Sequence, residues 1–337
     1  MNEEIMDEVT TNEKVTHGTL YVMRERDYFS GETLEYYKIG IVNGDKVVEK
    51  RRKDHLTGNP RDIFSVQEFT SLAVQKLETL LHNLYAANRV HSGEWFKFSD
   101  SEADALLQEI PKWQQLIDSK YLELDGKTVP KGPGSDQIIQ PDVNTLELAT
   151  ILAIALAEEK VAKANKSLVA KKLLEVAGDN PEFAVLFKSS TSTVGGSFST
   201  GQVKDKDKAL WELFMTIVTP KVAPKWTVTP PEGFEPTTSK FEKDELTDNP
   251  TQLHSLFMEA WGEEYRWSLE ADMIEDVLLV RAADALGIEG IFTWVNGEVK
   301  SFDKEGFKAK HPDIYEECIP PKKTISKVTP AEWKSYV

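Results

Sequence analysis

In the stretch EKRRKDHLTGNP at residues 49–60, the consecutive cations Arg51, Arg52 and Lys53 follow Lys50 and lie shortly before His55. Arg51 and His55 are four residues apart, so a helix would present both side chains on one face. A guanidinium keeps its charge and can bind phosphate through two hydrogen bonds, and an imidazole can transfer protons near neutral pH. The pattern favours a phosphate-facing helix surface. Solvated cations and a histidine that complements the C-terminal helix dipole would give the same sequence.

A second pair of titratable residues has the same spacing. The leucines of residues 71–90 recur at helical intervals and predict an amphipathic helix, with Ser71 as a candidate N-cap. Glu78 and His82 are four residues apart and would share one face of this helix. An exposed glutamate and a histidine that supports the fold are the ordinary alternative.

Strands and helices alternate around these two pairs. Aromatic and apolar runs bounded by turn residues predict strands at 18–29, 33–42, 62–69 and 93–98, the first two forming a hairpin. Helices are predicted at 46–58, stopped by Gly58, and at 71–90. Residues 15–100 therefore predict a small α+β unit of order β-β-α-β-α-β. Residues 1–14 predict a disordered acidic tail.

The charge is unevenly distributed along the chain. The 337 residues carry a formal net charge of −16, which argues against nonspecific coating of nucleic acid. Residues 15–100 contain 12 Lys+Arg and 12 Asp+Glu, whereas residues 101–337 contain 27 and 39. A local cationic surface in the N-terminal unit is therefore compatible with the acidic whole.

Cysteine content and hydropathy bear on the cellular compartment in which the protein is expected. Cys318 is the one cysteine, so neither an intramolecular disulfide nor a cysteine-rich zinc cage can form. The N-terminus has no apolar signal core, and the apolar run at 148–157 is too short to span a bilayer. We expect a cytoplasmic protein without membrane partners.

Five sequence pieces occur in a characteristic order: LYV, YKIG, KRRKDH, LETLLHNLY and GEWF. Together they resemble the GIY-YIG nuclease superfamily, in particular the phage and bacterial branch that has KIG in the second motif. The resemblance covers residues 15–100, about a quarter of the chain. It implies a compact fold that hydrolyses phosphodiesters with one divalent metal ion, Mg²⁺ or Mn²⁺.

The resemblance also implies roles for particular residues. Arg51 would stabilise the phosphorane, Glu78 would hold the metal ion, and three side chains would prepare the nucleophile: Tyr21, Lys38 and His55. Tyr37 and His82 are secondary candidates. Lys38 stands where the family often has tyrosine, and Thr19 replaces the opening glycine of the first motif, so the general base stays open. Gly40 is expected to allow close backbone approach, and Trp95 and Phe96 are expected in the core.

The rest of the chain predicts a linker and a second domain. Residues 101–141 predict a helix, kinked or restarted at Pro111, followed by a Gly/Pro linker. Residues 142–337 predict a mainly helical acidic domain. Its predicted features are helices at 142–178, 207–218 and 250–287, a flexible loop at 189–202, an irregular segment at 219–251 and a hairpin turning at Asn296-Gly297. The carboxylates at 259–276 could bind metal, but acidic helix faces are usually just solvated.

Taken together, the sequence predicts a metal-dependent DNA endonuclease of phage, mobile-element or defence type. The C-terminal domain would contact a protein partner or mediate self-association. Two other hypotheses stay open. One is a binding module that keeps the nuclease fold without catalysis, and the other is an acidic protein that mimics DNA.

Overall fold

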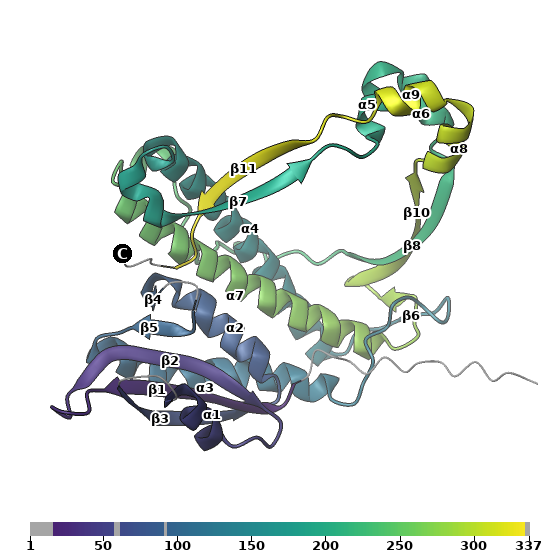
Figure 1. Ribbon diagram of the computed structural model, residues 1–337. Coiled ribbons are helices and arrows are strands. Elements are labelled where there is room, and N and C mark those ends of the chain that lie inside the picture. The colour runs from purple at the N-terminus through teal and green to yellow at the C-terminus, as the bar shows by residue number, and fades with distance from the viewer. Residues whose placement is uncertain (1–15, 57–60, 91–92, 334–337) are drawn as a thin grey trace, which may run out of the picture.

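The computed structural model describes residues 16–56, 61–90 and 93–333. The predicted tail at 1–14 and the predicted helix stop at Gly58 lie outside these residues. The architecture is mixed α+β, as predicted: an antiparallel sheet with helices comes first, and a mainly helical part follows (Figure 1).

The N-terminal part is a five-stranded antiparallel sheet with strand order β3-β1-β2-β5-β4. The predicted β-β-α-β-α-β order is found, with the two-residue β4 as an addition. The elements in chain order are β1 (Gly18–Arg26), β2 (Thr33–Asn43), α1 (Val48–Leu56), β3 (Asp62–Ser71), α2 (Val74–Leu84), the 3₁₀ turn η1 (Ala86–Asn88), β4 (Arg89–Val90) and β5 (Trp95–Lys97).

Alternation of side chains gives this sheet two distinct faces. Tyr37 and Ile39 of β2 join one apolar cluster with the leucines of α2. Tyr21 and Met23 of β1 join another cluster with Val48 of α1. The two helices therefore cover opposite faces of the sheet.

Ser71 is not the N-cap of α2, contrary to the prediction. It ends β3, and its Oγ donates to Asp118 Oδ1 at 2.7 Å and accepts from the Ala73 N–H at 3.1 Å. The helix begins at Val74, and its N-cap residue makes no side-chain cap bond. A tertiary hydrogen bond to α3 (Asp100–Leu124) therefore takes the place of local capping.

The helix α3 runs without interruption through Pro111, so the predicted restart is not found. Ser99 caps it in a capping box with Glu102. Proline removes one backbone hydrogen bond, but Ile110 and Ile117 on either side are fully buried. Packing along the whole length keeps the two halves in one helix.

Two long helices, α4 (Val143–Ala177) and α7 (Pro250–Ala282), form the centre of the C-terminal part. Asp142 and Asn249 cap their N-termini, and the helices pack against each other. One apolar cluster includes residues of the sheet, α2, α3, α4 and α7. The predicted domain division stays a prediction, but this core runs across it. In the part of the chain that the structure describes, no helix is long and apolar enough to cross a membrane.

Two β-ribbons extend from the long helices to a small outlying group of helices (Figure 1). One pairs β7 (Phe187–Val194) with β11 (Lys323–Pro330), and the other pairs β8 (Ile217–Trp226) with β10 (Phe292–Ser301). The outlying helices are α5 (Thr200–Lys206), α6 (Lys208–Leu213), α8 (Lys304–Lys310) and α9 (Pro312–Glu317). Aromatic residues that flank the outlying helices, Phe198, Phe214 and Phe302, pack around Phe307 of α8. The short remaining elements are β6 (Ile138–Ile139), η2 (Pro181–Leu186), η3 (Lys243–Glu245) and β9 (Gly287–Ile288).

Four predictions for this region are wrong. The predicted helix at 207–218 ends at Leu213, and its last two residues, Ile217 and Val218, begin β8. The predicted loop at 189–202 contains most of β7 and the start of α5, and the predicted irregular segment at 219–251 begins with most of β8. The predicted hairpin turn at Asn296-Gly297 lies inside the continuous strand β10. Pairing with β8 along its whole length holds these residues extended and overrides the local turn preference.

Candidate functional site

The helix α1 brings His55 and Arg51 to the face of the sheet that contains Tyr21. Tyr21 is buried, with 1% of the residue exposed, and its hydroxyl oxygen lies 3.2 Å from His55 Nε2. Burial raises the pKa of Tyr21 to about 12, against a hydrogen-bonding interaction with Arg51 that lowers it. Burial, and then the charges of Lys38 and Arg51, lower the pKa of His55. A neutral phenol and a neutral imidazole therefore face each other at neutral pH.

The cations Arg51, Arg52 and Lys53 of α1 differ in their surroundings. The guanidinium of Arg52 donates to Glu49 at 2.8 Å and, through Nη1, to the Ile63 carbonyl at 2.9 Å, so it fastens α1 to β3. Lys53 is exposed and lies 4.0 Å from Glu49. Arg51 is exposed and interacts with the Tyr21 hydroxyl. Arg51 is thus the cation of this run that faces Tyr21.

Gly40 of β2 leaves the space that the Tyr21 ring occupies. The two residues are directly paired across β1 and β2. A Cβ on residue 40 would lie 2.6 Å from the Tyr21 hydroxyl oxygen, closer than real Cβ contacts. The expected close approach at Gly40 is therefore made by the tyrosine side chain.

Gly40→Ala is expected to displace Tyr21 from His55. Overpacking of a filled core costs about 1–3 kcal/mol, which thermal unfolding would detect as a lower Tm. Gly201→Ala in α5 is the matched control, because its nearest side-chain atom would be 3.7 Å away. Equal Tm values for the two variants and the wild type would contradict this packing.

The helix α2 docks at an edge of β2. Lys38 is the last residue of β2 that pairs with β5, opposite Trp95. Beyond it, His82 Nε2 lies 3.0 Å from the Ile39 carbonyl oxygen. Burial lowers the pKa of His82 to about 4, so the ring is neutral and donates this bond. The histidine fixes α2 to the strand.

Glu78 lies one turn before His82 on α2 and is partly buried. Burial raises the pKa of its carboxyl to about 7, and the neighbouring Glu94 raises it further. Lys38, Arg89 and Arg51 oppose this shift through their charges, and no hydrogen bond is among the causes. The carboxylate is therefore short of local compensation, as expected for a group that would bind a cation.

Lys38 forms a partly buried ion pair with Glu94. Burial opposes ionisation of Glu94, but its hydrogen bond and charge attraction with Lys38 lower its pKa overall. The Lys38 Nζ also lies 5.8 Å from the centre of the Trp95 ring. Lys38 thus neutralises one of the two neighbouring carboxylates and leaves Glu78 as the less compensated one.

The structure groups five predicted residues near the middle of β1 and β2, where the pairing of β2 with β5 ends: Tyr21, Lys38, Arg51, His55 and Glu78. Tyr37 is not among them. It is 3% exposed, lies on the opposite face and packs edge-on against Phe98. His82 adjoins the group, but its hydrogen bond is with the Ile39 carbonyl of the strand.

Sequence reasoning missed two members of this group, Glu94 and Arg89. Both influence the Glu78 carboxyl electrostatically, and the partly buried Arg89 donates to the Gly93 carbonyl at 2.7 Å. The signal for Glu94 was a charged residue inside the aromatic piece GEWF, which was interpreted as core. Arg89 carried no comparable signal.

With this geometry in place, comparison with known proteins is informative. Residues 18–111 match the T5orf172 domain. This match describes a nuclease-like or nucleic-acid-related module, and it contains every residue of the site. The T5orf172 domain region reaches into α3, beyond the predicted limit at residue 100. No curated protein and no solved structure matches the chain.

The donor set suits a hard divalent cation with few protein ligands. Among the residues that the structure describes, no three His, Cys, Asp or Glu side chains gather as a metal cage. Magnesium usually keeps several waters and takes one or two carboxylates plus substrate phosphate oxygens. Glu78, only partly compensated by nearby cations and close to the Glu94 carboxylate, fits that kind of binding.

Proposed function

We propose that this protein is a metal-dependent DNA endonuclease that hydrolyses phosphodiester bonds. One observation carries the proposal: within the T5orf172 domain region, β1, α1 and α2 bring together Tyr21, the Arg51 and His55 side chains, and Glu78. Phosphodiester hydrolysis needs a cation that binds the phosphate, a pair of groups that transfers a proton, and a carboxylate that binds a metal ion.

The Tyr21–His55 pair prepares the nucleophile. His55 is neutral and can accept a proton at Nε2, 3.2 Å from the phenol oxygen. A water at Tyr21 gives its proton to the phenol oxygen while the phenol proton moves to His55. Because burial holds the pKa of Tyr21 near 12, the phenol relays the proton and is not a standing phenolate.

The remaining groups act on the phosphate. The water oxygen forms a bond to phosphorus, the bond from phosphorus to the leaving oxygen breaks, and that oxygen takes a proton from solvent. Arg51 binds the phosphorane oxygens, where a fixed guanidinium is most effective. Glu78 would hold Mg²⁺ or Mn²⁺, which supplies Lewis-acid stabilisation of charged phosphate oxygens. Lys38 keeps Glu94 neutralised beside Glu78.

The exposed ribbons of the C-terminal part support a nucleic-acid partner. Strands β7, β8, β10 and β11 carry six lysines and one glutamate, although residues 101–337 are acidic as a whole. All six lysines are exposed. Lysines on exposed ribbons suit contact with a phosphate backbone.

Tyr21→Phe and His55→Ala test whether the pair acts as a unit. Each is expected to reduce the cleavage rate about 10²-fold, the usual size of a lost general-base path. The cleavage rate of the double variant should also fall by about 10²-fold, because the first change already breaks the relay and the second has nothing more to remove. Single-turnover rates would measure this, and a double loss equal to the product of the single losses would contradict the relay.

The proposed function is tested with the full-length protein and a covalently closed circular DNA. Cleavage is followed with Mg²⁺, with Mn²⁺ and with excess chelator. Conversion to nicked or linear product with either ion, and none with chelator, is expected. Intact circles under all conditions, on single-stranded and double-stranded circles alike, would contradict the proposal.

A further inference from the structure

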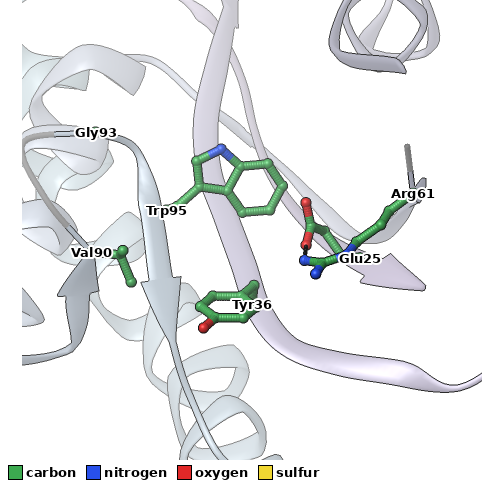
Figure 2. A pocket seen from close by; sticks show the side chains of 6 residues that line it. All are labelled: Glu25, Tyr36, Arg61, Val90, Gly93 and Trp95. Carbon is green, nitrogen blue, oxygen red and sulfur yellow. Dashed lines mark hydrogen bonds and ion pairs between the residues drawn. The ribbon is translucent and has the colours of Figure 1, made fainter. Parts of the chain in front are cut away.

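A pocket of about 450 Å³ lies beside the proposed catalytic site, and its lining residue Trp95 is paired with Lys38. Figure 2 shows the rings of Trp95 and Tyr36 between Val90 on one side and the Arg61–Glu25 pair on the other. Its lining residues are Glu25, Tyr36, Arg61, Val90, Gly93 and Trp95.

The pocket and the catalytic group share neighbouring residues. Tyr36 and Lys38 lie two apart on β2 and so on one face. Trp95 pairs with Lys38 across β2 and β5, and its ring centre lies 5.8 Å from the Lys38 ammonium. Glu94, which influences Glu78, is the residue next to Trp95. A substrate held at Arg51 and Glu78 would therefore reach this pocket with the adjoining nucleotide.

The lining combines aromatic surface with paired charges. Tyr36 and Trp95 are both partly exposed, so ring surface is accessible to a ligand. Arg61 Nη1 donates to Glu25 Oε2 at 2.8 Å, and Glu25 is 8% exposed. Aromatic rings stack on nucleobases of any sequence, and an arginine–carboxylate pair offers donors and acceptors to a base edge.

We propose that this pocket binds a nucleobase that is unstacked from its neighbours, next to the bond that is cut. This rests on the proposed endonuclease function and names its substrate class. A base inside a duplex is stacked on both sides and cannot lie against Tyr36 or Trp95 without leaving the helix. The preferred substrate is therefore DNA with an unpaired nucleotide at the cleavage site, as in a single strand, a bulge or a flap.

The test measures binding separately from cutting. Glu78→Gln full-length protein is titrated with labelled DNA of one sequence in three forms: single strand, duplex with a one-nucleotide bulge, and perfect duplex. Single-stranded and bulged DNA are expected to bind more tightly than the perfect duplex. Adding Tyr36→Ala should weaken those two forms roughly 5- to 100-fold and leave duplex binding nearly unchanged.

Two variants control for the tyrosine hydroxyl and for the loss of a tyrosine outside the pocket. Tyr36→Phe keeps the ring and should retain tight binding, and Tyr28→Ala removes a 58% exposed tyrosine outside the pocket and should have no effect. Unchanged affinity of the Tyr36→Ala protein for all three forms would overturn the nucleobase pocket. Loss of affinity for all three forms by the same factor would also overturn it, because a general DNA contact would then explain Tyr36.

The two proposals fail in different ways. If wild-type protein cuts DNA but Tyr36→Ala neither weakens binding nor changes the preference among the three forms, the pocket is wrong and the nuclease stands. If the binding pattern is found but wild-type protein cuts none of the forms, the pocket stands as a binding site and the catalytic proposal is wrong. Absence of any binding would overturn both.

Discussion

Arg51→Ala is expected to reduce the DNA cleavage rate by about 10²- to 10⁴-fold, with little change in stability. Arg51 is exposed, and its buried partner, the Tyr21 hydroxyl, keeps its 3.2 Å hydrogen bond with His55 when Arg51 is removed. The loss should fall on the chemical step, because charge builds up on the phosphorane oxygens in the transition state. Single-turnover rates with saturating protein would measure it directly.

Lys53→Ala is the matched control for this result. It removes the same charge from the same helix, two residues further on and therefore on a different face. Its rate is expected to stay within a few-fold of the wild type. Arg51→Lys should recover only part of the activity, because an ammonium lacks the planar two-point contact. Equal losses for Arg51→Ala and Lys53→Ala would mean that Arg51 acts only through general charge.

Glu78→Gln is expected to abolish cleavage, by about 10³-fold or more, and to stabilise the metal-free fold at neutral and higher pH. The amide is nearly isosteric but is a far weaker ligand for a hard cation. The stability effect has a separate cause, the partial burial of a carboxylate with too little compensation. A functional group that costs stability is typical of an active site.

The sign of the stability effect follows from the pKa. In the folded protein the pKa of Glu78 is raised from 4.5 to about 7, so between these values the folded state holds more protons than the unfolded state. Stability is then fully present below pH 4.5, falls as pH rises through about 7, and stays reduced above it. With chelator at pH 8, Glu78→Gln should be more stable by about 1–3 kcal/mol.

Denaturant unfolding at pH 4.5 and pH 8 measures this difference. The extra stability of the Glu78→Gln protein should vanish at pH 4.5, where the wild-type carboxyl of the folded protein is protonated. Glu147→Gln, a change at an exposed glutamate of α4, should show no such pH dependence. A Glu78→Gln protein less stable than the wild type at pH 8 would contradict the electrostatic account.

Local pattern was sufficient to predict the sheet and its two helices. The strands of residues 18–43 and the helix that contains Glu78 follow from periodicity and turn residues, and side chains four apart on a helix meet the same neighbours. The grouping of Tyr21 with Arg51 and Glu78 came from ordered family motifs. Distances between separate elements are not encoded in local spacing.

Long-range contacts account for the features that the sequence did not predict. Ser71 hydrogen-bonds to Asp118 and does not cap the helix that follows it. Glu94 lies near Glu78 because β5 pairs with β2 at Lys38. The predictions for the ribbon residues were wrong for the same reason, because β7 pairs with β11, which is far away in the sequence. Ser/Thr-rich and Asn-Gly sequences look like loops until a distant partner strand is known.

The most direct test of the central claim compares wild-type and Glu78→Gln proteins, purified in parallel, on the same supercoiled plasmid with Mg²⁺ and with chelator. The account predicts nicked or linear DNA from the wild type with Mg²⁺ and intact plasmid in the other three reactions. Equal cutting by both proteins with Mg²⁺ would contradict it, because the activity would then not depend on Glu78.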